Sequence, residues 1–337
     1  MKEEKRLISV LNSNLAQVPP IWLMRQAGRY LPEYRELRAK TGSFWTMCMT
    51  PKLASEITLQ PIRRFGFDAA ILFSDILVIP AALGMKVEFT DGVGPSMAPI
   101  SSAAGLRFDA GTLTPVYEAL GLVRGSLPTT TGLLGFAGAP WTLATYMAAG
   151  RGGDEQKAAK LWAYREPENF AQLLDVLTDC VAHHLARQIE AGADAVQIFD
   201  SWASGLPEAM FERWVIAPTK KIVAKLRTIH PKALVIGFPR AATLAGYERY
   251  ATETGVDAVS LDTAAPMGWA AKTLKLPVQG NLDPIALIAG GKALQDGIDT
   301  ILRATRGVPF VFNLGHGILP ETPIVHVEEL IARVRAA

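Results

Sequence analysis

The chain is built from short apolar runs, each followed by a polar or glycine-containing stop and then by a stretch of helical character. Eight such runs occur, over residues 21–24, 69–73, 132–136, 195–199, 234–238, 258–261, 276–279 and 310–313. Runs of about 4–8 apolar residues between turn signals are typical of strands buried on both faces, as in a parallel sheet. The pattern therefore predicts eight parallel strands.

The segments between these runs predict helices. Residues 167–192 carry apolar side chains at a helical period, and residues 241–255 repeat the plan. Strands that alternate with helices eight times favour a single (β/α)8 barrel of the TIM type. An open, doubly wound sheet is the alternative, because a count of runs does not prove closure. No linker-like segment divides the chain, so residues 1–337 are expected to form one domain.

One segment departs from the alternation. Residues 84–111 are rich in Gly, Pro and Ser and contain short alternating runs. They predict a β-hairpin excursion in the loop that follows the second strand. Loops of this length in compact domains are usually functional or mobile.

Composition narrows the class of protein. Of 337 residues, 49% are hydrophobic and 20% are charged, and the formal net charge is +2. This excludes a disordered chain, and the near-zero charge argues against nucleic acid as a partner. Cys48 and Cys180 lie far apart and lack metal-ligand spacing, so both are expected to be small buried residues.

Nothing in the sequence predicts membrane insertion or export. The N-terminal residues are charged and lack an apolar core, so no signal peptide is expected. The uncharged stretch 126–150 contains Pro128 and Pro140, which indicates strand, loop and helix start rather than a membrane span. The default compartment is the reducing cytoplasm.

Polar side chains follow nearly every predicted strand. In barrel enzymes the active site lies at the carboxyl ends of the strands, so these side chains are candidates for one shared pocket. In chain order they are Arg25, Arg29, Asp75, Tyr146, Asp200, Ser201, Arg240, Asp262, Asn281, Asp283 and His316. For each of them, a helix cap or a loop salt bridge is the alternative interpretation.

The loop after the first strand is the most informative. It places Arg25 and Arg29 in one glycine-containing turn, and Arg35 and Arg38 follow closely. Arginine forks bind carboxylate or phosphate bidentately, so this cluster on a nearly neutral chain indicates a small polyanion. Salt bridges to neighbouring glutamates are the alternative, which suits Arg35 and suits Arg25 poorly.

Two further residues stand out. Asp75 has apolar neighbours on both sides, so its carboxylate needs cationic or N–H partners, from a helix end, an arginine or a ligand. His316 lies between two glycines, in a loop that can wrap closely around a ligand. The chain contains no phosphate-binding loop, no dinucleotide fingerprint, no nucleophile elbow and no zinc-protease motif.

Several motifs together resemble one family. Residues 20–34, PIWLMRQAGRYLPEY, strongly resemble the opening signature of the uroporphyrinogen decarboxylase family, and residues 135–143, GFAGAPWTL, resemble its second signature. The similarity continues through TLQPIRRF (58–65), FSDIL (73–77), QGNLDP (279–284) and NLGHG (313–317). One departure is FPRAA (238–242), which is less glycine-rich than in many members and affects only local loop geometry.

The resemblance implies a (β/α)8 barrel that forms a homodimer and needs no metal or organic cofactor. It implies removal of carbon dioxide from the four acetate side chains of uroporphyrinogen III, which gives coproporphyrinogen III in porphyrin and haem biosynthesis. The catalytic residues it implies are Asp75 and Arg25. The substrate-binding residues it implies are Arg25, Gln26, Ala27, Gly28, Arg29, Arg38, Asp75, Phe136, Tyr146, Phe199, Ser201 and His316.

Physical chemistry agrees with such a substrate. Eight carboxylates explain an arginine cluster on a neutral chain. One carboxylate such as Asp75 can accept the inward-pointing pyrrole N–H groups and stabilise a ring made cationic by protonation. Arg25, water and a substrate carboxyl are three alternative proton donors.

Two other functions compete with this one. A corrinoid-dependent methyltransferase of the same superfamily needs a zinc site from a His-x-Cys pair and a later Cys, which Cys48 and Cys180 do not supply. A non-catalytic tetrapyrrole-binding protein needs the arginines but no central carboxylate, so Asp75 argues against it.

Overall fold

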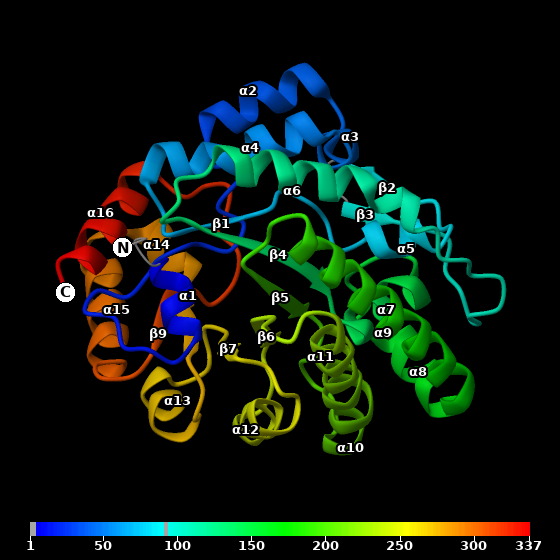
Figure 1. Cartoon of the computed structure of the whole chain (residues 1–337). Helices are drawn as coiled ribbons and strands as arrows, with labels where there is room; N and C mark the ends of the chain where they lie inside the picture. The colour runs from blue at the N-terminus through cyan, green and yellow to red at the C-terminus, as the bar shows by residue number, and fades with distance from the viewer. Residues whose placement is uncertain (1–4, 91–93) are drawn as a thin grey trace.

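The computed structural model describes residues 5–90 and 94–337, and a curled parallel sheet of seven strands lies at its centre (Figure 1). The strand order is β1-β4-β5-β6-β7-β8-β9, and every neighbouring pair is parallel. The strands span Ala69–Ile71, Gly132–Gly138, Ala195–Asp200, Val235–Pro239, Ala258–Ser260, Val278–Leu282 and Phe310–Leu314. Seven of the eight predicted runs are therefore confirmed as strands.

Helices surround the sheet (Figure 1). Ahead of β1 lie α1 Arg6–Leu11, α2 Pro32–Thr41, α3 Phe44–Cys48 and α4 Pro51–Phe65. Between β1 and β5 lie α5 Val78–Ala82, η1 Ala110–Leu113, α6 Thr114–Ser126, α7 Pro140–Ala149, α8 Lys157–Arg165 and α9 Pro167–Glu190. Between β5 and β8 lie α10 Glu208–Phe211, η2 Glu212–Ile216, α11 Ala217–Ile229, α12 Leu244–Glu253 and α13 Met267–Thr273. The last helices are α14 Pro284–Ala289, α15 Gly291–Ala304 and α16 Ile324–Arg335. None of the described helices is both long and apolar enough to span a bilayer.

The first predicted strand, 21–24, is reduced to a single bridge that lies between β9 and β1. Ile21 pairs in parallel with Phe312, whose N–H donates to the Pro20 carbonyl oxygen (2.9 Å). On its other side, Ile21 accepts a bond from the Asp68 N–H and donates to the Asp68 carboxylate, both at 2.9 Å. The two edge strands of the sheet thus meet the same segment of chain.

Side-chain amides replace the missing ladder. Gln26 accepts a hydrogen bond from the Leu23 N–H and donates one to the Ala69 carbonyl oxygen, both at 3.0 Å. Asn313 accepts one from the Met24 N–H at 2.9 Å. The Gln26 side chain is fully buried, so the structure places it in the wall beneath the first loop.

Loss of the Gln26 amide is expected to destabilise the fold. Gln26→Met keeps the chain length but leaves a buried N–H at Leu23 and a buried carbonyl at Ala69 without partners. At roughly 1–3 kcal/mol for each such group, the free energy of unfolding should fall by about 2–6 kcal/mol in a urea titration. Gln295→Met is the control, because Gln295 bonds only to Glu329 near the surface. A change at Gln26 no larger than at Gln295 would show that the wall does not depend on this amide.

The apolar core has an inner and an outer part. The inner cluster contains Trp22, Phe199 and Phe238. Leu7 and Leu11 of α1 belong to the same cluster, and Leu7 lies beside Gly132, at the start of β4. The outer cluster fills the space between sheet and helices. Side chains that alternate along each strand supply the two clusters in turn, as strands buried on both faces require.

Two short strands follow β1. β2 (Glu88–Thr90) pairs antiparallel with β3 (Gly94–Ser96), and residues 91–93 of the segment lie outside the described residues. Phe89 packs against Phe44 and Trp45, with ring centroids 4.9 and 5.6 Å apart. This segment therefore rests on α3.

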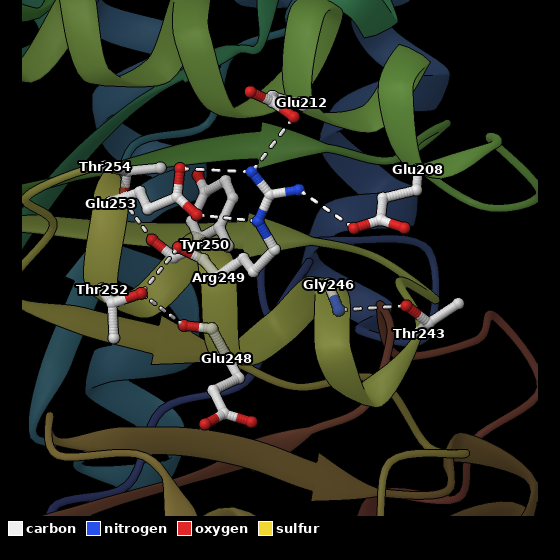
Figure 2. Close-up of polar contacts among 10 residues, drawn as sticks. All are labelled: Glu208, Glu212, Thr243, Gly246, Glu248, Arg249, Tyr250, Thr252, Glu253 and Thr254. Atoms are coloured by element: carbon white, nitrogen blue, oxygen red, sulfur yellow. Dashed lines mark hydrogen bonds and ion pairs between the residues drawn. The ribbon is translucent and has the colours of Figure 1, made fainter.

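An exposed ion-pair network joins the helices that follow β5 and β6. Arg249 of α12 pairs with Glu253 (2.7 Å), Glu212 (3.2 Å) and Glu208 (3.4 Å), as Figure 2 shows. Exposed pairs of this kind are typically worth about 0–1 kcal/mol each. The network ties α12 to α10 and η2 at the surface, and the core supplies most of the stability.

Candidate active site

The first arginine of the site has an unusual backbone. Arg25 follows the 20–24 segment with φ +62°, a left-handed value that costs a residue with a side chain roughly 1–3 kcal/mol. A Cβ at Gly317 would overlap the Cδ of Arg25. The loop of His316 was predicted to approach a ligand closely. Because Gly317 has no side chain, the Arg25 side chain can pass directly beside this loop.

Asp75 lies between β1 and α5 and is partly exposed. Its Oδ1 accepts the Leu77 N–H at 2.8 Å. Asp75 thus caps the turn before α5, in agreement with the alternative interpretation of strand-end polar residues as caps. The Leu77 N–H is the one hydrogen-bond partner of the Asp75 carboxylate among the described residues, which leaves Oδ2 open to a ligand. Burial raises the pKa of Asp75, and the Leu77 N–H and the nearby Arg25 partly offset that rise.

Tyr146 and His316 share Arg25 as a neighbour. Burial lowers the pKa of His316 to about 4, and the charges of Arg25 and Arg240 add to the effect, so the imidazole is neutral at physiological pH. Burial raises the pKa of Tyr146; Trp202 and Arg25 act against that rise and Asp75 adds to it. The structure therefore brings Asp75, Tyr146 and His316 within electrostatic reach of Arg25.

Aromatic rings line the inner face of β4, β5 and β6. Phe136 meets Phe199 edge to face at 5.6 Å, and Phe199 meets Phe238 at 6.1 Å. Gln188 of α9 holds the Phe136 backbone through two hydrogen bonds of 2.9 and 2.8 Å. Phe238 is fully buried and Phe199 is almost so, whereas Phe136 is half-buried, so Phe136 is the ring of the three that is most accessible to a ligand.

Apart from the buried Gln26, the first loop is open. Arg25 and Arg29 are exposed, and Ala27 and Gly28 are half-buried. Arg35, expected to pair with acidic neighbours, instead donates to the carbonyl oxygens of Arg29 (2.9 Å) and Tyr30 (3.1 Å). Glu33 pairs with Arg64 (2.8 Å), because α4 brings that cation closer than α2 brings Arg35. Arg35 thus fixes the backbone that carries Arg29.

Arg38 and Ser201 complete the set of sequence candidates. Arg38 lies on α2, with Nη1 3.5 Å from the Tyr34 hydroxyl. Ser201 is half-buried directly after β5. Ser201 thus lies at the carboxyl end of a strand, whereas Arg38 lies on a helix between the first predicted strand and β1.

Other strand-end carboxylates point away from the site. Asp200 is buried against α7 and accepts the Thr142 hydroxyl at 2.5 Å, and burial raises its pKa to about 7. Asp262 accepts the Tyr247 hydroxyl, also at 2.5 Å, and the Ala241 N–H at 3.0 Å. Both carboxylates therefore stabilise loops, which is the alternative role that strand-end polar residues were expected to have.

Neither a metal cluster nor a surface groove competes with this site. Over residues 5–90 and 94–337, no three His, Cys, Asp or Glu side chains gather as a metal ligand set would. A shallow groove between α4 and α6, lined by Lys52, Leu59 and Leu122 among others, carries none of the predicted site residues.

Solved structures share this fold at low sequence identity. A methyltransferase from Methanosarcina mazei superposes with a TM-score of 0.82 at 19% identity, over 99% of this chain and 98% of that one. A B12-independent methionine synthase from Shewanella sp. W3-18-1 gives 0.55 at 13% identity, over 95% and 96%. At such identities the likeness concerns the fold alone.

Sequence relatives are much closer. Uroporphyrinogen decarboxylases from Chelativorans sp. (strain BNC1) and Sphingopyxis alaskensis are 54% and 53% identical, each over 98% of both chains. That of Mesorhizobium japonicum is 52% identical over 100% of this chain and 99% of its own. The uroporphyrinogen decarboxylase (URO-D) family model matches residues 2–337. With a family model and half-identical relatives that both span the chain, and with the signature residues meeting around Arg25, the chain belongs to the uroporphyrinogen decarboxylase family.

Proposed function

We propose that this protein removes the four acetate carboxyl groups of uroporphyrinogen III and so makes coproporphyrinogen III for haem biosynthesis. Membership of the family supports the reaction and the substrate. The observation that carries the mechanism is Asp75, a partly buried carboxylate with one oxygen left open beside Arg25.

The proposed architecture is one (β/α)8 barrel over residues 1–337, with a hairpin excursion after the second barrel strand. The bonds of the 20–24 segment to both β9 and Asp68 support closure. The β2–β3 pair supports the excursion.

In the proposed complex, the arginines bind carboxylates and the rings hold the macrocycle. Arg25, Arg29 and Arg38 supply guanidinium forks. Phe136 and Phe199 support the apolar faces of the pyrroles, and Ala27 and Gly28 offer backbone groups. Tyr146, Ser201 and the neutral His316 contribute hydrogen bonds. Gln26 acts from within the wall, by holding the loop.

The proposed chemistry uses the pyrrole ring as its own electron sink. A proton added to a ring carbon makes the pyrrole cationic. The bond between the acetate methylene and its carboxylate then breaks, carbon dioxide leaves, and the bond's electrons neutralise the ring. A second proton then adds to the exocyclic methylene to make a methyl group, and the proton first added to the ring carbon leaves, which restores the neutral pyrrole. Asp75 accepts the pyrrole N–H groups and stabilises the cation, since fixed charge in a dry site acts strongly.

The working form is proposed to be a homodimer in the cytoplasm. The family resemblance supports the dimer. Two buried, unpaired cysteines are consistent with a reducing compartment.

Activity without added metal or cofactor is the direct test. Purified protein, dialysed against EDTA and kept anaerobic, is expected to convert uroporphyrinogen III to coproporphyrinogen III at the undialysed rate, followed by chromatography of the oxidised products. Activity that is lost on dialysis and returns only with zinc or a corrinoid would contradict the proposed function.

A further inference from the structure

Arg240, which follows β6, is a half-buried cation that the sequence predicted for the shared pocket without a specific role. Its Nη1 donates to the carbonyl oxygen of Ser201 at 3.4 Å. Within the described part of the chain, this is the side chain's one acceptor, and no carboxylate pairs with the guanidinium. Most of its hydrogen-bonding capacity is therefore free to meet a ligand.

The backbone around Arg240 is held in place. Its N–H donates to the carbonyl oxygens of Asp200 (3.1 Å) and Phe238 (3.0 Å). The next residue, Ala241, has φ +55° and donates its N–H to Asp262. A strained turn that persists in this way indicates that the surroundings fix the direction of the Arg240 side chain.

The neighbours of Arg240 place it on one side of the site. Its charge and that of Arg25 both act on His316, whereas Arg25 is the one arginine that acts on Asp75. Arg240 follows β6, three places from β1 in the strand order, and bonds to Ser201, so it lies on the side of Ser201 and away from Asp75, which follows β1. The charge of Arg25 acts on Asp75, whereas no carboxylate pairs with the Arg240 guanidinium among the described residues, so an anionic ligand can bind it.

We propose that Arg240 binds a propionate carboxylate of the substrate, with Ser201 and His316 beside it. The inference rests on the proposed function. Decarboxylation moves the electrons of the breaking C–C bond into the ring. A cation bound to the reacting carboxylate would stabilise its charge and oppose that movement. An arginine remote from Asp75 therefore suits a carboxylate that does not react. Acetates disappear over the four steps while all four propionates remain, so only a propionate can occupy such a site throughout.

This role makes a distinct kinetic prediction. A carboxylate that keeps its charge is bound equally in the ground and transition states, so losing its partner raises KM and leaves kcat unchanged. Arg240→Gln should raise KM for uroporphyrinogen III by about tenfold, as expected for loss of a charge-assisted hydrogen bond. It should weaken anaerobic equilibrium binding of coproporphyrinogen III by a similar factor, with kcat within about twofold of wild type. Arg240→Lys should give a KM between those of the wild type and Arg240→Gln.

Arg306→Gln is the matched control, because it removes the same charge from the connection between α15 and β9, at the amino-terminal end of a parallel strand, whereas Arg240 follows the carboxyl end of β6. It should behave as wild type, and thermal melts should confirm that all variants fold. An unchanged KM in Arg240→Gln would overturn the proposal. So would a loss of kcat at constant KM, or weaker uroporphyrinogen binding with unchanged coproporphyrinogen binding. If the wild type neither converts uroporphyrinogen nor binds coproporphyrinogen, the proposed function is wrong and this inference fails with it.

Discussion

Asp75→Asn is expected to lower kcat by about a hundred- to a thousandfold while the protein stays folded. Asparagine keeps the size of the side chain and can still accept the Leu77 N–H, but it removes the negative charge beside the cationic ring. Removal of one preorganised stabilising group typically costs about 10²–10³ in kcat. Anaerobic single-turnover rates, which report the chemical step, are the measurement.

Asp75→Glu and the thermal melt separate charge from shape. Glutamate keeps the charge but displaces it, so part of the activity should remain. Burial raises the pKa of Asp75, so the ionised group costs folding free energy at neutral pH, and the Asn variant should unfold at the same temperature or higher. An active Asn enzyme beside an inactive Glu enzyme would show that Asp75 supplies shape rather than charge.

Arg25→Lys is expected to lower kcat/KM by about a hundredfold. Lysine keeps the charge but loses the planar fork that binds a carboxylate with two parallel bonds. Arg25 also interacts with Asp75, Tyr146 and His316, so its displacement disturbs three groups at once. Steady-state kinetics at limiting uroporphyrinogen measures this loss directly.

Gly317→Ala offers an independent route to the same effect. The new Cβ would overlap the Arg25 side chain and push it from its path, so kcat/KM should fall without any change to the arginine itself. Gly268→Ala is the control, since a Cβ there meets no atom within 4 Å. Wild-type kinetics in both Arg25→Lys and Gly317→Ala would show that Arg25 serves the structure rather than the substrate.

Most of the fold was predictable because buried parallel strands leave a clear mark in the sequence. Seven apolar runs became strands, and the helix expected over 167–192 is α9, Pro167–Glu190. The first run failed as a strand because its backbone groups bond to Asp68, Gln26 and Asn313 side chains instead of a continuous ladder. A short apolar run does not reveal partners such as Asp68 and Asn313, which lie 47 and 289 residues further along the chain.

The candidate site was predictable as a set of residue types at strand ends, but not as contacts. Sequence placed Asp200 and Ser201 together, whereas the alternation of side chains along β5 turns Asp200 outward to Thr142. Arg240 was predicted only as a member of the shared pocket, because its neighbours, Ser201 and His316, follow other strands. Strain at Arg25 and the space above Gly317 are properties of backbone geometry, which a residue list does not contain.

The 20–26 segment has a consequence for synthesis of the protein on the ribosome. Met24 bonds to Asn313, 289 residues later, and the Ile318 N–H donates to the Met24 carbonyl oxygen. At about 5–20 residues per second, the arginine loop emerges roughly 15–60 s before its anchors exist. The first part of the active site to be translated is thus among the last to be fixed, and any nascent chain halted before β9 carries its cationic loop without a support.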